Sequence, residues 1–423
     1  MGASGLKRPK NINLTSETTR GAVQTKKCAP PTLGLCIEIR VTGTPASTRP
    51  DKARERRVRG TPGQGKGLGD EPRAKRRVAR RVIINSPIAA PTRPENLPTS
   101  VILGTGAYAP LKILTNADLE KIVATNGPWI VSRTGIKERH IAAEGETTSD
   151  MAAAAARRAL EFAGVDASEI DLIIVATVTG DTPTPSCAAF VQAKIGAFNA
   201  FAFDVSAACA GSLYGLVIAD QFIRNGMARR ALVIGAETLS RVVDWTNRET
   251  CVLFGDAAGA MLLCASEAPT RGLIAAKLRT DGSMTEILGI FGGGSRRPFS
   301  QEMLTDNGHK IKMRGREVYK AAARLLPEVV REALDQAGLE AADLTHVIAH
   351  QANLRIIESA METLGVPLEK CWINIDRYGN TSSASMPITL DEANRAGRLK
   401  QGDVIAMMAI GAGMSWGSAI LRW

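Results

Sequence analysis

The pattern of apolar and polar positions changes near residue 100. Before that point, polar, Pro, Gly and Arg residues follow one another without a helical or strand period. The run 101–106 is apolar and ends in glycines, which is typical of a buried strand that enters a turn. Further apolar runs at 172–176, 231–234, 347–349 and 404–409 alternate with helical segments. Such runs indicate sheets that are covered on both faces, so the sequence predicts an α/β fold.

An internal repeat indicates that the folded part of the chain is duplicated. Residues 158–176 recur as residues 332–350, at an offset of 174 positions. Each copy predicts a helix, a Gly that ends it, a short acidic turn and a buried strand. We therefore expect two similar halves, 99–272 and 273–423, whose two sheets enclose shared helices. Ligand sites are expected where strands lead into loops at the junction of these halves.

Residues 1–98 differ in composition from the rest. They hold 21 Lys/Arg against 7 Asp/Glu, including the basic run 73–81. Such a segment buries too little apolar area to offset its ordering entropy, so we expect a disordered basic N-terminal extension. Three interpretations stay open: an arm for anionic surfaces or organellar targeting, a dispensable tail, and a start site assigned too far upstream.

The remaining residues carry 32 Lys/Arg and 35 Asp/Glu, so the net charge of +11 is a property of the extension. No nucleic-acid-binding body is expected. The apolar fraction of 44% is that of a globular protein. The 7 cysteines form no CxxC pair, and there is neither a long apolar window nor a secretory signal. These features predict a reduced cytoplasmic protein with no membrane partner and no metal.

Cys209 is the first candidate for chemistry. It lies between a predicted strand, 200–205, and a predicted apolar helix, 213–223. The N–H groups and dipole at a helix N-terminus are expected to lower the pKa of such a thiol and favour the thiolate. Small neighbouring residues permit a tight turn and leave space for a thioester. The alternative is a buried cysteine with no chemical role.

His350 and Asn380 are the second and third candidates. His350 follows the predicted strand 347–349, where the first copy of the repeat has Ala176, so it interrupts the repeat at the functional end of a strand. A structural histidine is the alternative. Asn380 follows Gly379 in a predicted turn, where an asparagine without any chemical role is common.

Together, Cys209, His350 and Asn380 resemble the Cys, His and Asn set of β-ketoacyl-acyl-carrier-protein synthase III enzymes. The resemblance covers essentially residues 100–423 in order. It rests on the segments 104–106, 129–136, 204–211, 254–260, 350–357, 379–382 and 416–419. Related families with the same fold have a second His, a Cys or a Glu in place of Asn380. Chalcone-type polyketide synthases share all three residues, but the run 350–357 resembles the carrier-dependent type.

The resemblance implies a five-layered α-β-α-β-α thiolase fold, a homodimer and a two-stage reaction without a cofactor. The Cys209 thiolate attacks a short acyl-CoA, and the N–H groups of Cys209 and Ala412 hold the oxyanion. Malonyl-acyl-carrier protein (malonyl-ACP) then loses carbon dioxide while His350 Nε2 and the Asn380 amide stabilise the enolate. The carbanion attacks the acyl group and gives 3-oxoacyl-ACP.

The resemblance also assigns binding residues. Those implied to contact CoA are Trp129, Arg133, Arg248, Gly315 and Asn353. The adenine is expected to stack between Trp129 and Arg248, because aromatic and guanidinium groups both suit a nucleotide base.

The acyl carrier protein (ACP) is the implied protein partner. The residues implied to contact it are Lys320, Arg355, Gln351 and Ala352. Glu362 and Thr363 stand where some relatives have two lysines, which weakens the expected docking patch. Thr184 falls where some relatives place Phe at the base of the acyl pocket. We therefore expect space for a primer longer or more branched than acetyl.

Three functions follow for comparison. The first is initiation of type II fatty-acid synthesis, and the second is a synthase of secondary metabolism that makes alkylquinolone or polyketide starters. The third, a scaffold or nucleic-acid binder, is disfavoured by the three candidate residues and the acidic body. The segment 291–295 is Gly-rich but lacks a following helix or Lys, so a flexible loop is expected there and not a phosphate-binding loop.

Overall fold

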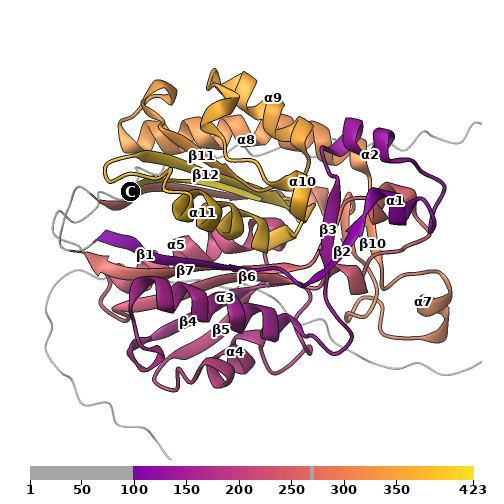
Figure 1. Ribbon diagram of the computed structural model, residues 1–423, viewed down its shortest axis with the longest axis horizontal. Coiled ribbons are helices and arrows are strands. Elements are labelled where there is room, and N and C mark those ends of the chain that lie inside the picture. Colours follow the sequence, from indigo (N-terminus) through magenta and orange to yellow (C-terminus); the bar gives the residue numbers. More distant parts are fainter. Residues whose placement is uncertain (1–98, 267–270) are drawn as a thin grey trace, which may run out of the picture. The chain divides into compact units, whose positions relative to one another are not determined.

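Two β-sheets form the framework of the computed structural model, which describes residues 99–266 and 271–423 (Figure 1). The predictions for residues 1–98 lie outside this range. The first sheet has the order β1 (Thr99–Tyr108), β7 (Ala257–Ser266), β6 (Arg230–Glu237), β4 (Leu172–Ala176) and β5 (Phe201–Val205). The second has the order β11 (His346–Ala349), β12 (Val404–Gly411), β13 (Ser415–Arg422) and β8 (Gly272–Thr280).

The strand directions divide each sheet into a parallel and an antiparallel part. β4 runs parallel to β5 and β6, and β11 runs parallel to β12. The other neighbouring pairs in the two sheets are antiparallel. The predicted apolar runs lie on β4, β6, β11 and β12, whose residues are almost all buried. The interpretation of these runs as sheets covered on both faces is therefore confirmed.

Helices lie between the sheets and on both outer faces (Figure 1). α5 (Gly211–Arg224) and α11 (Ser385–Arg395) contact both sheets from the middle layer. α3 (Thr148–Ala163) and α4 (Cys187–Ile195) cover the first sheet. α8 (Gly315–Ala337) covers the second sheet, and α9 (Leu354–Leu364) packs on α8. These layers confirm the predicted five-layered α-β-α-β-α fold.

Shorter elements complete the chain. Two small antiparallel pairs are β2 (Lys112–Thr115) with β3 (Glu138–Ile141), and β9 (Leu288–Ile290) with β10 (Ile311–Met313). The short α-helices are α1 (Asn116–Leu119), α2 (Gly127–Thr134), α6 (Arg248–Cys251), α7 (Gln301–Thr305) and α10 (Ile375–Tyr378). The Gly-rich segment 291–295 is a loop. Within the described ranges, no helix has the length and apolar character needed to cross a bilayer.

The repeated segment folds in the same way in both halves. α3 begins at a capping box in which the side chains of Thr147 and Asp150 each bond the other's N–H, and it ends at Gly164 with φ of 66°. α8 ends at Gly338 with φ of 68°. A left-handed residue favours glycine, so the repeated Gly sets the same helix end twice. Each helix is followed by a 3₁₀ turn and then by β4 or β11.

The apolar layer between the sheets fixes the two central helices. Leu213 and Leu216 of α5 and Met386 and Leu390 of α11 are at most 1% exposed. Burying one such side chain contributes about 1.5–3 kcal/mol. The N-termini of α5 and α11 are therefore held firmly relative to both sheets, and the turns that precede them carry the candidate chemistry.

Close packing of β1 against α3 explains the glycines at 104 and 106. A Cβ added at Gly104 would lie 2.5 Å from the Ala159 carbonyl oxygen. At Gly106 it would lie 2.3 Å from the Ala155 carbonyl oxygen and 2.5 Å from the Ala159 nitrogen. No side chain fits in these gaps, so both residues must lack one.

Gly106→Ala should therefore push α3 away from β1. We expect the free energy of unfolding to fall by about 1–3 kcal/mol or more, measured by guanidinium denaturation. Gly282→Ala is the matched control, because nothing lies within 4 Å of a Cβ added there. Its stability should stay within about 0.5 kcal/mol of the unmodified chain. Equal stability of the two variants would contradict the close packing.

Candidate active site

Cys209 lies in a tight turn between β5 and α5. The turn, η2 (Ala208–Ala210), contains left-handed backbone at Ala208, where φ is 46°. Cys209 is 8% exposed. The end of β12 approaches it closely, since a Cβ added at Gly411 would lie 2.5 Å from the Cys209 nitrogen. Because Gly411 has no side chain, the backbone of the second half can lie beside the thiol.

His350 directly follows β11 and is held from two sides. Its N–H donates to the Met408 carbonyl at 2.8 Å, which continues the pairing of β11 with β12. Its Nδ1 lies 2.6 Å from the Ser385 hydroxyl, at the start of α11. The single hydrogen of the Ser385 hydroxyl is donated either to His350 Nδ1 or to the Ser382 carbonyl, which lies 3.0 Å away. The imidazole is thereby oriented by the helix of the middle layer.

Asn380 lies in the loop between α10 and the turn η7 (Ser382–Ala384). Its N–H donates to the Leu253 carbonyl at 2.9 Å, and its carbonyl accepts from Gly255 at 3.0 Å, so the backbone is tied to the first half. The Ser382 N–H donates to Asn380 Oδ1 at 2.9 Å. With Oδ1 engaged in this way, the Nδ2 donors are the part of the amide available to a ligand.

The three candidates line one cavity of about 860 Å³. Residues from both halves therefore converge, as the sequence suggested. Apolar side chains make up part of the wall, among them Val252, Leu253, Phe254, Ile356 and Ile410. Gly411 and Met414 also line the cavity, whereas Ala412 is not among its lining residues. Cys209 and the 411–414 turn are adjacent, but the described wall does not include the second predicted oxyanion donor.

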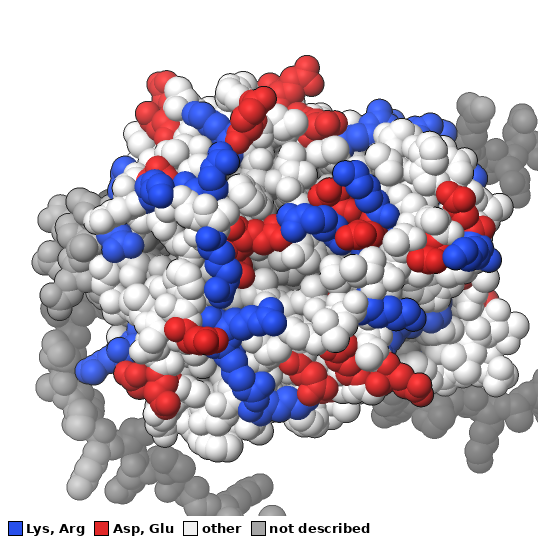
Figure 2. Space-filling model, in the orientation of Figure 1, with Lys and Arg blue, Asp and Glu red and all other residues white. Residues whose placement is uncertain are grey.

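Basic side chains dominate the charged residues of the cavity wall. Arg133, Arg314, Arg316, Lys320 and Arg355 outnumber the acidic Glu249 and Glu317. On the face of the molecule in Figure 2, by contrast, basic and acidic side chains are interspersed. The cavity therefore suits an anionic ligand better than that surface does. Among the described residues, no group of three or more His, Cys, Asp or Glu is placed to hold a metal ion.

Four of the predicted CoA-contacting residues line the cavity: Trp129, Arg133, Gly315 and Asn353. The fifth, Arg248, stacks directly on Trp129, with its guanidinium 4.8 Å from the ring centroid. The adenine of CoA could bind between Trp129 and Arg248 only if the two side chains move apart. Asn353 caps α9 and donates from Nδ2 to the Arg133 carbonyl at 3.0 Å, which joins α9 to α2.

The predicted carrier contacts divide into three accessible residues and one buried residue. Lys320, Arg355 and Ala352 line the cavity. Gln351 is 1% exposed, donates to the Ala349 and Trp372 carbonyls, and accepts at 3.1 Å from the N–H groups of Asn374 and Ile375. The structure contradicts its assignment as a carrier contact, because every polar atom of its side chain is used within the core.

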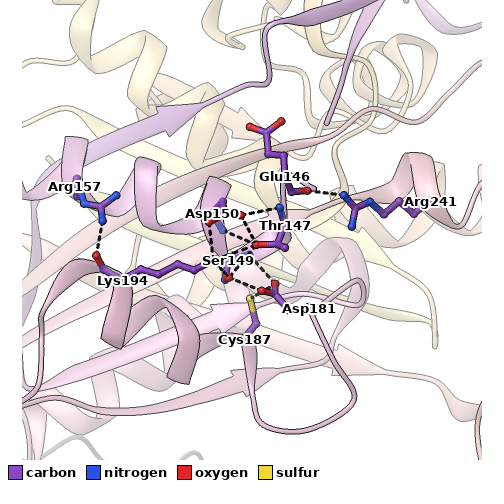
Figure 3. Close-up of polar contacts among 9 residues, drawn as sticks. All are labelled: Glu146, Thr147, Ser149, Asp150, Arg157, Asp181, Cys187, Lys194 and Arg241. Atoms are coloured by element: carbon purple, nitrogen blue, oxygen red, sulfur yellow. Dashed lines mark hydrogen bonds and ion pairs between the residues drawn. The ribbon is translucent and has the colours of Figure 1, made fainter. Parts of the chain in front are cut away.

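Thr184 is not part of the cavity wall. It lies on an exposed loop before α4. The loop is anchored by Asp181, which accepts from the Ser149 N–H at 2.9 Å and from its hydroxyl at 2.5 Å (Figure 3). Lys194 donates to Ser149 and to Asp150, each at 2.6 Å, and completes this cluster at the start of α3.

Burial keeps the ionisable groups of the site close to neutral. It raises the pKa of Cys209 to about 12, although a hydrogen bond from the Ser382 side chain lowers it in part. It lowers the pKa of His350 to about 3. The expectation that the helix N-terminus leaves Cys209 with a lowered pKa is therefore wrong, because desolvation of the thiolate outweighs the favourable contacts. The resting thiol is protonated, and the imidazole is uncharged.

Ser382, Ser385 and Glu237 also lie at the site, although they were not among the residues predicted from the sequence. Ser385 orients His350, while Ser382 connects to Cys209 and lies 3.1 Å from the buried Glu237 carboxyl. The sequence did hold a signal for Glu237, since an acidic residue ends the otherwise apolar run that forms β6. The two serines are small polar residues in a turn, where their neighbours are not visible from the sequence.

Comparison with known proteins identifies the family of this chain. A family model described as 3-oxoacyl-[acyl-carrier-protein (ACP)] synthase III matches residues 203–282, and the model for its C terminal matches residues 334–423. Beta-ketoacyl-[acyl-carrier-protein] synthase III of Caldanaerobacter subterraneus subsp. tengcongensis is 50% identical over 322 residues, which cover 76% of this chain and 97% of that protein.

Solved structures give the same result. The crystal structure of 3-oxoacyl-[acyl-carrier-protein] synthase III from Aquifex aeolicus VF5 has a TM-score of 0.72 and 48% identity, covering 77% of this chain and 100% of that one. The priming beta-ketosynthase of the R1128 polyketide biosynthetic pathway has a TM-score of 0.72 and 36% identity, covering 79% and 99%. Fold and cavity thus define an enzyme of the thiolase superfamily. The chain belongs to the β-ketoacyl-[acyl-carrier-protein] synthase III family.

The lowered pKa of His350 predicts an acid-sensitive fold. Unfolded His binds a proton below its ordinary value of 6.5, whereas folded His350 does so only near 3. Stability is therefore retained above about pH 6.5 and lost as the pH falls between these values. Between pH 7 and pH 5, the free energy of unfolding should fall by roughly 2 kcal/mol less in His350→Gln than in the unmodified chain. Guanidinium denaturation at each pH measures this difference. Parallel losses in the two proteins would contradict an uncharged His350.

Proposed function

We propose that this chain condenses a short acyl-CoA with malonyl-ACP, giving 3-oxoacyl-ACP, CoA and carbon dioxide, the reaction that initiates type II fatty-acid synthesis. The observation that carries the proposal is the single cavity lined by Cys209, His350 and Asn380. The relatives described above are named for acyl-carrier-protein-dependent synthesis, which supports the choice of carrier.

In the first half-reaction, Cys209 takes the acyl group. Its sulfur attacks the thioester carbon, and charge develops on the carbonyl oxygen. The N–H of Cys209 and one from the 411–413 turn are the proposed donors to that oxygen, with Ala412 as the proposed second donor. The closeness of Gly411 to the Cys209 nitrogen supports this arrangement, because it brings both backbone segments to the same place.

In the second half-reaction, His350 and Asn380 stabilise the enolate that forms as malonyl-ACP loses carbon dioxide. Both side chains are neutral donors: Asn380 offers Nδ2, and His350 offers Nε2–H when Nδ1 accepts from the Ser385 hydroxyl. Donors that are fixed before the reaction lower the barrier without having to reorganise. The uncharged state of His350 suits this role in the tautomer whose single ring proton lies on Nε2. That tautomer requires the Ser385 hydroxyl to donate to Nδ1 instead of to the Ser382 carbonyl.

The basic residues of the cavity wall suit both phosphorylated partners. Arg133 is the proposed contact for the phosphates of CoA, and Lys320 and Arg355 are the proposed contacts for the acidic carrier protein. Positive charge also comes from the start of α8, where Arg314 and Arg316 line the cavity together with Lys320. In α9, by contrast, Glu362 and Thr363 supply no positive charge. The expected weak docking patch is thereby strengthened from a different helix.

A homodimer is proposed from the first sheet. β5 is an edge strand that pairs only with β4. Phe201 at its start is 41% exposed, and Phe198 just before it is 73% exposed. An unpaired edge flanked by apolar side chains is a natural site for pairing with the same edge of a second copy.

The half-reactions can be separated by mutation. Cys209→Ser should abolish the mass increase of the protein on incubation with acetyl-CoA. His350→Ala and Asn380→Ala should keep self-acylation measurable but slow malonyl-ACP decarboxylation by about 10²–10³-fold, measured as released carbon dioxide. Cys371→Ser, which alters a buried thiol outside the cavity wall, is the control and should behave like the unmodified chain. Equal loss of both half-reactions in all three variants would contradict the assigned roles.

The expectation from Thr184 is tested by the same mass measurement with isobutyryl- and octanoyl-CoA. We expect acylation by at least one of these longer or branched primers, and acylation by acetyl-CoA alone would contradict the expectation.

The dimer has a test of its own. Sedimentation of the full chain should give twice the mass of one chain, and Phe201→Lys should shift it toward the monomer, because a charge at the buried edge is unfavourable. Phe299→Lys is the control, since Phe299 is 71% exposed on a loop near α7. A Phe201→Lys protein that remains dimeric would show that β5 is not the interface.

The similarity to the R1128 priming ketosynthase favours one alternative, a starter synthase of secondary metabolism. Malonyl-CoA in place of malonyl-ACP distinguishes the two. Faster turnover with malonyl-CoA would favour the alternative, and dependence on malonyl-ACP favours fatty-acid initiation.

A further inference from the structure

Glu237 is a buried carboxyl to which the reaction described above gives no role. It ends β6 and is 0% exposed. Its Oε2 accepts from the Thr179 hydroxyl at 2.6 Å and from the Val178 N–H at 3.1 Å. Its Oε1 lies 3.1 Å from the Ser382 hydroxyl and 3.2 Å from that of Ser383. All its hydrogen-bond partners in the described part of the chain are hydroxyls or backbone N–H groups, with no Lys, Arg or His among them.

The internal duplication relates Glu237 to the strand end beside the nucleophile. The offset of 174 residues superimposes β6 on β12, so Glu237 corresponds to Gly411. It also superimposes the turn η2 on η7, and both contain left-handed backbone at the same place, with φ of 46° at Ala208 and 50° at Ser382. Glu237 therefore lies beside η7 at the position that Gly411 occupies beside η2. A carboxyl group contacts η7, whereas the equivalent residue at η2 has no side chain.

Ser382 connects this carboxyl to the nucleophile. Its hydroxyl donates to Glu237 Oε1 at 3.1 Å, and it lies close enough to the Cys209 side chain to favour the thiolate. A hydroxyl has one hydrogen to donate. It can donate to a carboxylate while accepting from the thiol, or donate to the thiolate while accepting from a carboxylic acid. The two patterns differ by the transfer of one proton from Cys209 to Glu237.

We propose that Glu237 accepts the Cys209 proton through Ser382 during acylation and holds it until the thiol is regenerated. In acylation the S–H bond breaks and the sulfur electron pair forms the bond to the thioester carbon. The thiol proton passes to Ser382 Oγ, and the Ser382 hydrogen passes to Glu237 Oε1. CoA leaves as its thiolate and takes a proton from water. In condensation the carbanion expels the Cys209 thiolate, and the stored proton returns by the same route.

The neighbouring titratable groups fit this role. Burial raises the pKa of Glu237 to about 7, so the carboxyl can hold or release a proton near neutrality. His350, with its pKa lowered to about 3, is a weaker base. Cys187 also lies near Glu237, and burial together with Asp181 raises the pKa of its thiol far above the ordinary value, so it stays neutral. The contacting hydroxyls, including Thr177 at 3.3 Å, do not titrate.

The test measures how the rate of self-acylation depends on pH, in the full chain with acetyl-CoA in a single turnover. The unmodified chain should speed up with pH and level off above about pH 7, as Glu237 ionises. Glu237→Gln keeps the size of the side chain but cannot take a proton. It should be slower by about 10²-fold or more near pH 7 and should rise about tenfold per pH unit without levelling off. Glu237→Asp, which retains a carboxylate, should restore the plateau.

Two serine variants separate the relay from general packing. Ser382→Ala should reproduce the profile of Glu237→Gln, and its fold should survive because Ala208 already adopts the same left-handed backbone in the equivalent turn. Ser383→Ala is the matched control. Ser383 also lies beside Glu237, but its hydroxyl donates to the Ala176 carbonyl at 2.7 Å, so the plateau should remain.

The proposal rests on Cys209 as the nucleophile, and the outcomes distinguish the two claims. Wild-type pH profiles in Glu237→Gln and Ser382→Ala would overturn the relay and leave the proposed function intact. Absence of acylation at Cys209 in the unmodified chain would overturn the proposed function. If Glu237→Gln does not unfold cooperatively, the profile of Ser382→Ala decides.

Discussion

The active site depends on close backbone contacts of the turns η2 and η7, which precede the central helices α5 and α11. Only glycine permits these contacts with the neighbouring strands. A Cβ added at Gly235 of β6 would lie 2.1 Å from the Ser383 carbonyl oxygen. One added at Gly411 of β12 would lie 2.5 Å from the Cys209 nitrogen, and one at Gly211 would lie 2.9 Å from Ala176 Cβ. These distances leave no room for a side chain, so each turn is held against a strand by direct contact. The apolar middle layer keeps both turns in that position.

This packing also accounts for the electrostatic character of the site. The Cys209 thiol, the proposed nucleophile, the His350 imidazole and the Glu237 carboxyl are all nearly inaccessible to water, and burial shifts each toward its neutral form. A site of neutral groups contrasts with the basic residues nearer the surface of the cavity, which suit anionic substrates. Charge thus suits attraction of the ligands, while the proposed reaction takes place among neutral groups.

Much of this arrangement could be predicted from the sequence, because it follows from local patterns. The apolar run 172–176 coincides with β4, and the repeat at an offset of 174 correctly predicted equivalent helices, glycine stops and strands in both halves. Cys209, His350 and Asn380 were found because each follows a predictable strand or turn, and they do line one cavity. The three-dimensional surroundings of single residues could not be predicted from such local patterns. Gln351 is buried although its neighbour Ala352 lines the cavity, and burial reverses the pKa shift expected for Cys209. Glu237 and Ser382 are 145 residues apart, so their contact was invisible from the sequence.

The decisive measurement is a crystal structure of the protein after reaction with an acyl-CoA. We expect an acyl group on Cys209 Sγ, with its carbonyl oxygen between the N–H of Cys209 and the 411–413 turn, and with His350 Nε2 and Asn380 Nδ2 facing the same space. An acyl group on another side chain, or a carbonyl oxygen directed away from both backbone segments, would contradict it.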